Sequence, residues 1–205
     1  MRSSRVFVKS LGVLLFVLAL VWAGRAPQTA AYSPAAQAGR TAEQDVMPRY
    51  DKSGALILPA DYRRWVMVGS SLDLSYAEMP SQPGHQMFMH TLMEPTAHKA
   101  FVETGKFREG TMFVLLLQGV ADKVMPARQG QFAGDVHGVE MAVKDRAHSP
   151  DGWSYYGFGG MGGIRTTATA APKNNCYSCH VDHAQRDNVF LQFYPLLAEA
   201  AGLKK

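Results

Sequence analysis

The stretch "TMFVLLLQGV" (residues 111–120) is an apolar run of the length of a β-strand. Gly110 precedes the run, and Gln118 and Gly119 interrupt it near its end. A short continuous apolar run between such turn signals is typical of a strand that is buried on both faces. We therefore predict an interior strand here and build the domain outward from it.

Three further stretches have the composition of strands. "MFMHTLM" (Met87–Met93) precedes the central run, and "GVEMAVKD" (residues 138–145) and "GWSYYGFG" (residues 152–159) follow it, each opening with glycine. Aromatic and β-branched residues bounded by glycine favour strands. Strands in the middle of the chain with helices toward its ends indicate an α+β fold, a mainly antiparallel β-sheet with flanking helices.

The predicted helices lie on either side of these strands. "PTAHKAFVETG" (residues 95–105) opens with proline and ends with glycine, which is the usual punctuation of a helix. A short helix is expected through "DYRRW" (residues 61–65). "RDNVFLQFYPLLAEA" (residues 186–200) has apolar residues at helical spacing, so we predict a helix with a kink at Pro195.

The N-terminus has the pattern of a secretory signal. Arg2, Arg5 and Lys9 precede the apolar stretch "LGVLLFVLALVWA" (residues 11–23). A helix of that length rises only about 20 Å, which is short for a bilayer core of about 30 Å. We therefore predict a signal peptide over residues 1–31, with cleavage after residue 23 or 31, and export to the periplasm. An uncleaved N-terminal anchor is the alternative.

Composition divides the rest of the chain into two parts. Residues 32–46 are small, polar and aperiodic, so we interpret them as a flexible tether, and residues 47–205 are expected to form a single domain.

The charge of the chain is balanced once the signal is removed. Four of the 21 basic residues lie in the signal, and the remaining 17 equal the 17 acidic residues in number. The later sequence has no basic run, so we expect no nucleic-acid partner and no stable membrane insertion after processing.

The segment "CYSCH" holds both cysteines of the chain, Cys176 and Cys179, followed directly by His180. A zinc site would need a fourth ligand such as His183, at a spacing much tighter than that of ordinary zinc modules. A dithiol redox motif usually follows a strand in a thioredoxin-like unit, which is not indicated here. A structural disulfide suits an exported protein but gives no role to the histidine.

Covalent haem c accounts for every residue of this motif. C-x-x-C-H is the recognised attachment signature, in which each thiol forms a thioether with one vinyl group of the porphyrin. His180 then follows as the proximal iron ligand. We therefore predict one covalently bound haem c, attached through Cys176 and Cys179.

Several segments together resemble the cytochrome P-460 family, which also contains the cytochromes c′-beta. They are "LPADYRRWVMVG", "TGKFREGT", "VEMAVKD" and "CYSCH" with the later "DNVFLQFYPLL", in this order over nearly all of residues 56–200. The resemblance implies a mainly antiparallel β domain with helices, usually a homodimer, that binds one haem c. It also implies either hydroxylamine oxidation or the binding of nitric oxide and carbon monoxide.

The same resemblance implies three residues on the distal side of the haem. The lysine that cross-links to haem in the hydroxylamine-oxidising members is matched by Leu115, which has no nucleophilic atom. The family's distal glutamate is matched by Glu140, a candidate proton relay, and its distal arginine is matched by Met89. We therefore expect no cross-link and disfavour hydroxylamine oxidation.

Met89 is our candidate for the sixth iron ligand, because a thioether binds haem iron and raises its potential. Met87 is the near competitor, since strand alternation puts it on the same face. His90 is expected on the opposite face. An open sixth site is the remaining possibility.

The predicted signal peptide, the haem-attachment motif and Met89 together favour an exported mono-haem c cytochrome. It would transfer electrons with His180 and Met89 on the iron. Its expected partner is then a redox protein. The alternative is a protein that binds nitric oxide or carbon monoxide, as the cytochromes c′-beta do. An enzyme that oxidises hydroxylamine, with Glu140 accepting protons, is the third and weakest hypothesis.

Overall fold

The computed structural model describes residues 46–76, 86–160 and 162–203. The expected signal peptide and nearly all of the expected tether lie outside these residues. A five-stranded antiparallel sheet with strand order β2-β3-β4-β5-β6 forms the centre of the described part. Its strands are β2 (Val66–Leu72), β3 (Met87–Met93), β4 (Met112–Asp122), β5 (Gln131–Lys144) and β6 (Trp153–Gly157). The predicted α+β fold is confirmed, and the central apolar run is the middle strand.

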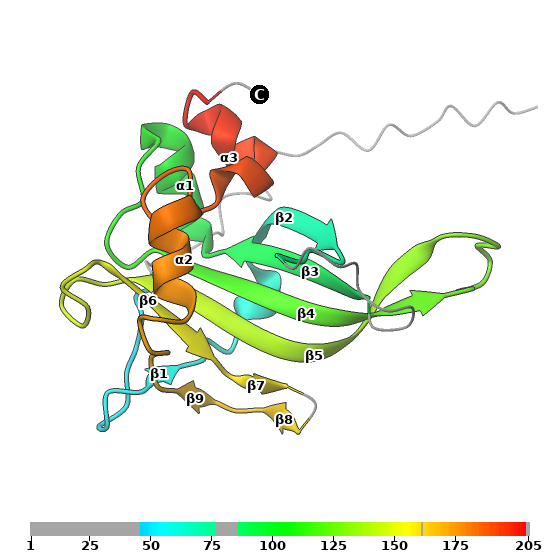
Figure 1. The fold of residues 1–205 in the computed structure, drawn as a ribbon, viewed down its shortest axis with the longest axis horizontal. Helices are drawn as coiled ribbons and strands as arrows, with labels where there is room; N and C mark the ends of the chain where they lie inside the picture. Colours follow the sequence, from blue (N-terminus) through cyan, green and yellow to red (C-terminus); the bar gives the residue numbers. More distant parts are fainter. Residues whose placement is uncertain (1–45, 77–85, 161, 204–205) are drawn as a thin grey trace, which may run out of the picture. The chain divides into compact units, whose positions relative to one another are not determined.

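Helices and short elements flank the sheet. The helices are α1 (Pro95–Thr104), α2 (Cys176–His183) and α3 (Pro195–Ala200), with single 3₁₀ turns η2 (Tyr62–Arg64) and η3 (Leu191–Phe193). Two short strand pairs complete the described part: β1 (Leu56–Ile57) with β9 (Thr167–Ala168), and β7 (Gly159–Gly160) with β8 (Gly163–Ile164). Figure 1 shows the three helices gathered at one end of the sheet.

The two faces of β4 pack against different groups of residues. Met112, Val114 and Leu116 belong to a core with residues of β1, η2 and β9. Phe113, on the other face, packs in a second core with residues of α1 and α3. Alternate side chains of a strand point to opposite faces, so this strand contacts protein on both sides. The sequence prediction of a strand buried on both faces holds for its first half.

The start of α1 is tied to the turn that leads into β4. Glu94 is only 1% exposed, and its carboxylate accepts hydrogen bonds from the backbone N–H groups of Thr96 (3.0 Å) and Ala97 (2.7 Å). Arg108 Nη2 lies 3.4 Å from the same carboxylate. Gly105 ends the helix in the left-handed conformation, with φ 67°. Proline at the start and glycine at the end of this helix therefore have the roles that the sequence predicted.

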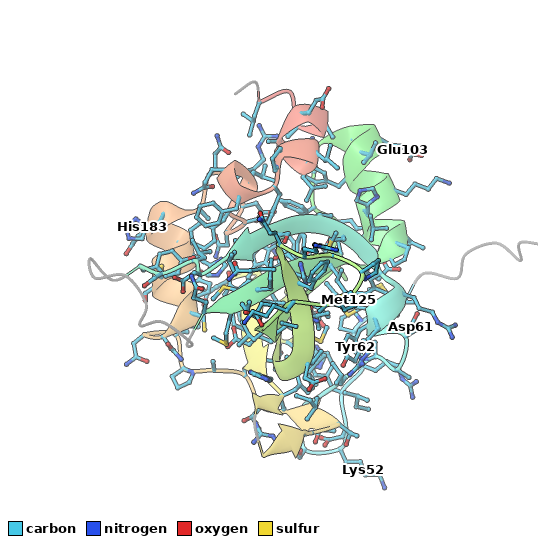
Figure 2. All side chains as sticks on the ribbon, turned by 90° about the vertical axis from the view of Figure 1, so that its right-hand side faces the viewer. Lys52, Asp61, Tyr62, Glu103, Met125 and His183 are labelled. Atoms are coloured by element: carbon cyan, nitrogen blue, oxygen red, sulfur yellow. The ribbon has the colours of Figure 1, made fainter. Side chains whose placement is uncertain are left out.

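Strand β5 is longer than its apolar pattern indicated. It begins at Gln131, before the expected start at Gly138, and its first half forms an arm with the end of β4. Figure 1 shows this arm projecting from the end of the sheet away from the helices. Met125 at its turn is 78% exposed and is labelled in Figure 2. Because the arm has little burial, its sequence lacks the apolar alternation that marks a strand.

The predicted C-terminal helix is wrong in its first half. Residues 186–190 form a tight turn and an extended segment, and η3 follows. Pro195 is the first residue of α3 and does not kink a longer helix. The apolar residues at helical spacing do not share one buried face, since Leu196 is 68% exposed and Val189 is only 5% exposed.

Within the described residues, no helix combines the length and the apolar character that a membrane span requires.

Candidate functional site

A cavity of about 830 Å³ lies between the sheet and α2. That volume is within the range of about 300–1,000 Å³ usual for ligand and cofactor sites. One wall is a face of the sheet, the other is α2, and aromatic residues from β6 and the C-terminal segment close the sides. Its lining includes Gly69, Ser71, Met87, Met89, Thr91, Phe113, Leu115, Leu117, Glu140, Tyr155, Cys176, Cys179, His180, Phe190, Phe193 and Tyr194.

Strand register brings the sequence-predicted distal residues onto one wall. Leu115 is paired with Thr91 on β3 and with Glu140 on β5. Met89 is paired with Leu117, one step along the same face. Residues directly opposite in an antiparallel pair have Cβ atoms about 4.5–5.5 Å apart. The three positions that the resemblance singled out are therefore neighbours in the sheet and line the same cavity.

Met87 and His90, the neighbours of Met89, lie on the faces of β3 that strand alternation predicts. Met87 lines the cavity beside Met89. His90 lies on the other face of β3, where its Nδ1 is 2.8 Å from Gln118 Oε1. The structure therefore brings two thioethers to the cavity wall and leaves His90 away from it.

Glu140 extends from this wall into the cavity. It is the sole carboxylate among the described lining residues, and they include no lysine or arginine. Its side chain is exposed to the space of the cavity, yet the surrounding walls withdraw enough water to raise the pKa of its carboxyl group. A carboxyl group with a raised pKa and no cationic partner in the lining holds its proton to a higher pH than an ordinary glutamate, which suits it to proton exchange.

Cys176, Cys179 and His180 lie on one face of α2. The spacings of three and four residues put side chains on the same side of a helix. All three line the cavity, and both cysteines are free thiols of intermediate exposure. Burial, with a smaller contribution from the carboxylate of Glu140, raises the pKa of the Cys176 thiol. The helix therefore presents two thiols and an imidazole to the sheet wall.

The imidazole of His180 has a defined tautomer. Its Nδ1 lies 2.7 Å from the backbone carbonyl oxygen of Asn188, which can only accept, so Nδ1 carries the proton and donates it. Burial lowers the pKa of the imidazole. A neutral ring with a protonated Nδ1 leaves the lone pair of Nε2 available to a metal.

Two aromatic rings flank this imidazole. The ring centroids of Tyr155 and Phe190 each lie 4.4 Å from that of His180. The hydroxyl of Tyr155 also donates to the carbonyl oxygen of Asn188, at 3.3 Å. These contacts restrict the rotation of the imidazole.

His183, the fourth residue of the zinc hypothesis, does not join the other three. It is exposed and lies on the outer side of α2, where Figure 2 labels it. In the part of the chain that the structure describes, no three Cys, His, Asp or Glu side chains are grouped as a metal site would need. The four residues of the zinc hypothesis are therefore divided, with Cys176, Cys179 and His180 lining the cavity and His183 exposed outside it.

A family model described as Cytochrome P460 matches residues 59–191. The chain belongs to the cytochrome P460 family. The match spans more than half of the 205 residues and includes both walls of the cavity. No curated protein sequence matches the chain significantly. Membership in the family implies a cytochrome that binds haem c, and it confirms the resemblance seen in the sequence.

The residues of the cavity fit that group. The donor set consists of two free thiols and an imidazole with an available Nε2. Helix α2 has only eight residues and none of them is buried. So short a helix depends on tertiary packing, and a porphyrin bonded to its thiols would add to the contacts that it already makes with Tyr155 and Phe190.

Sequence reasoning missed several residues that shape the site. The Asn188 carbonyl is a backbone group, and no side-chain pattern marks it. Tyr155 and Phe190 read as ordinary core residues. Strand β2 was also missed, although the alternation of Val66 and Val68 with other residues was a usable signal.

Proposed function

We propose that this cytochrome P460 family member is an exported mono-haem c protein that transfers electrons. The observation that carries the proposal is the hydrogen bond from His180 Nδ1 to the Asn188 carbonyl, with Cys176 and Cys179 on the same helix face. Cys176 and Cys179 are the proposed thioether positions, and His180 is the proposed proximal ligand. Bound there, haem c supplies a one-electron iron couple that a donor protein can reduce and an acceptor protein can reoxidise.

Met89 is the proposed second axial ligand. It lies on the sheet wall of the cavity that His180 lines from α2. A thioether is a soft ligand that favours ferrous iron and so raises the potential toward values suited to electron transfer. Leu115 and Leu117 give the part of this wall beside Met89 an apolar surface.

One optical experiment tests the axial ligands. The ferric protein should be low-spin and should show a weak sulphur-to-iron charge-transfer band in the near infrared. A high-spin, five-coordinate ferric spectrum would contradict electron transfer with paired axial ligands.

Binding of nitric oxide or carbon monoxide is the second candidate function. It is favoured by the apolar residues Phe113, Leu115 and Leu117 on the cavity wall, which suit a small uncharged gas. Rapid binding of carbon monoxide by the ferrous wild type would support this function over electron transfer. The two functions can also coexist, because a strong ligand can displace a thioether.

Hydroxylamine oxidation of the cross-linked kind is disfavoured by Leu115. A leucine side chain cannot form the bond to haem that the resemblance assigns to a lysine. The intact mass of the mature protein should therefore equal the processed chain plus one haem. A haem peptide that contains a lysine-bearing segment from another strand would contradict this assignment.

Export, the redox partner and the homodimer are also proposals. The basic residues before the apolar stretch of residues 11–23 support export through a signal peptide. The N-terminal sequence of the protein recovered from a periplasmic fraction tests it. A new N-terminus at residue 24 or 32 is expected, and recovery of Met1 in a membrane fraction would favour the uncleaved anchor.

A further inference from the structure

The carbonyl that accepts from His180 belongs to a tight turn. Val189 N donates to Arg186 O at 2.8 Å, and the central residues Asp187 and Asn188 have φ values of 47° and 56°. Positive φ at both central positions is the mark of a type I′ turn, and Asp and Asn tolerate this conformation better than other non-glycine residues. The local sequence therefore forms the turn, but it does not by itself orient the turn toward His180.

The carboxylate of Asp187 attaches this turn to the sheet. Lys144 Nζ donates to Asp187 Oδ2 at 2.6 Å, and Trp153 Nε1 donates to Asp187 Oδ1 at 3.0 Å. Both oxygens are thus engaged by donors from two adjacent strands, β5 and β6. A carboxylate held by two donors of different direction cannot rotate without losing one of them.

The two donors are themselves buried and held by further contacts. Trp153 is 2% exposed and lies in the core with Phe107 and Phe113. Lys144 is 6% exposed, and its Nζ also donates to the backbone carbonyl of Phe107 at 2.8 Å. An ammonium group is costly to bury unless it is paired and hydrogen-bonded, so the surrounding core holds it in this one arrangement.

A chain of hydrogen bonds therefore joins the sheet to the imidazole. It runs from Lys144 and Trp153 to the Asp187 carboxylate, through one peptide unit to the Asn188 carbonyl, and on to His180 Nδ1. The orientation and hydrogen bonding of a metal-ligating histidine tune the basicity of its other nitrogen. The anchor thus acts on the iron ligand without touching the haem cavity, because neither Lys144 nor Asp187 is among its lining residues.

We propose that Lys144, Asp187 and Trp153 are positioning residues that hold the Asn188 carbonyl against His180 and thereby set the donor strength of the proximal ligand. This inference rests on the proposed haem site. The ion pair between Lys144 and Asp187 then contributes to the midpoint potential of the iron in addition to its role in packing.

The test uses two variants that keep the turn and remove the carboxylate. Asp187→Gly permits positive φ, and Asp187→Asn keeps the turn preference with a neutral side chain. The ferrous, carbon monoxide-bound holoprotein is diamagnetic, so the Nδ1 proton of His180 can be observed by nitrogen-15 NMR whatever the native sixth ligand is. We expect exchange of this proton with solvent to be faster by on the order of tenfold in both variants.

The midpoint potential supplies a second readout. A weaker hydrogen bond to Asn188 makes the imidazole a poorer donor, which destabilises ferric iron and raises the potential. Glu109→Gln is the control, because it removes the same charge from an exposed ion pair with Arg146. It should leave both the proton exchange and the potential near their wild-type values.

The outcomes distinguish failure of the positioning role from failure of the proposed haem site. If the Asp187 variants retain haem and give the exchange rate and potential of Glu109→Gln, the positioning role is overturned while the haem site stands. If the wild type gives no haem-shifted His180 signal at all, the proposed haem site is itself wrong, and the positioning role falls with it.

Discussion

Leu115 on β4 lies directly opposite Glu140 on β5, and both line the cavity. An apolar side chain therefore stands next to the sole carboxylate among the described lining residues. Where the resemblance places a lysine at this position, an ammonium group would stabilise the ionised carboxylate. Here leucine supplies no such charge, and burial leaves the pKa of Glu140 raised.

This pair predicts a pH-dependent potential. Loss of the Glu140 proton would leave a negative charge in the cavity that is proposed to hold the haem, and this charge would favour the ferric state. The midpoint potential should therefore fall as pH rises through a window above the ordinary pKa range of glutamate, and it should be level below that window. Potentiometric titration across pH measures it, and Glu140→Gln should remove the fall.

A second variant tests the cause of the raised pKa. Leu115→Lys puts an ammonium group beside the carboxylate, which lowers the pKa of Glu140 and moves the window to lower pH. The substitution Leu117→Met, one position along the same wall, is a neutral control. An unchanged window in Leu115→Lys would mean that the two side chains do not interact.

Covalent haem attachment is tested at the two thiols. The double variant Cys176→Ser, Cys179→Ser should release its haem into acidified organic solvent, whereas the wild type should retain it. Haem staining after denaturing electrophoresis gives the same comparison. Ser178→Ala, between the two cysteines, is the control and should retain haem. Extraction from the wild type would rule out the thioether bonds.

The sequence correctly predicted those elements whose apolar pattern and terminal residues indicate the same structure. The span of β3 matches its expected bounds, Met87–Met93, and α1 begins at Pro95 and is capped by Gly105, because these residues impose their local conformation in any context. The central run could be predicted as a strand because the first half of β4 is apolar and buried on both faces.

The remaining features depend on tertiary contacts. The apolar residues of the C-terminal segment bury against different elements, so their helical spacing misled the prediction of a single helix. The cavity wall was foreseen only through the resemblance, since pairing between β4 and β5 is not marked in the sequence. The anchoring of the Asp187 turn involves a lysine 43 positions away in the chain, which no local pattern reveals.

Met89 is tested by its replacement with alanine. If its sulphur binds the iron, Met89→Ala should abolish the near-infrared band, give a high-spin five-coordinate haem, lower the potential and speed the binding of carbon monoxide. The direction follows because a thioether favours ferrous iron and an incoming gas must otherwise wait for it to leave. Met87→Ala is the matched control on the same wall. If Met87→Ala gives these changes and Met89→Ala does not, Met87 is the ligand.

Glu94 provides a prediction about stability that is independent of haem. Its carboxylate caps two N–H groups of α1, accepts from the Thr96 hydroxyl at 2.7 Å and pairs with Arg108. Glu94→Ala leaves these donors without their acceptor in a buried position, which should lower the free energy of unfolding by about 2–4 kcal/mol. Glu103→Ala, at an exposed position of the same helix, should change it by less than about 0.5 kcal/mol. Urea titration with an unchanged m-value measures both.

No residue of α1 is among those that line the cavity, so the haem spectrum of folded Glu94→Ala should match that of the wild type. Equal losses in the two variants would show that the carboxylate of Glu94 does not anchor the helix.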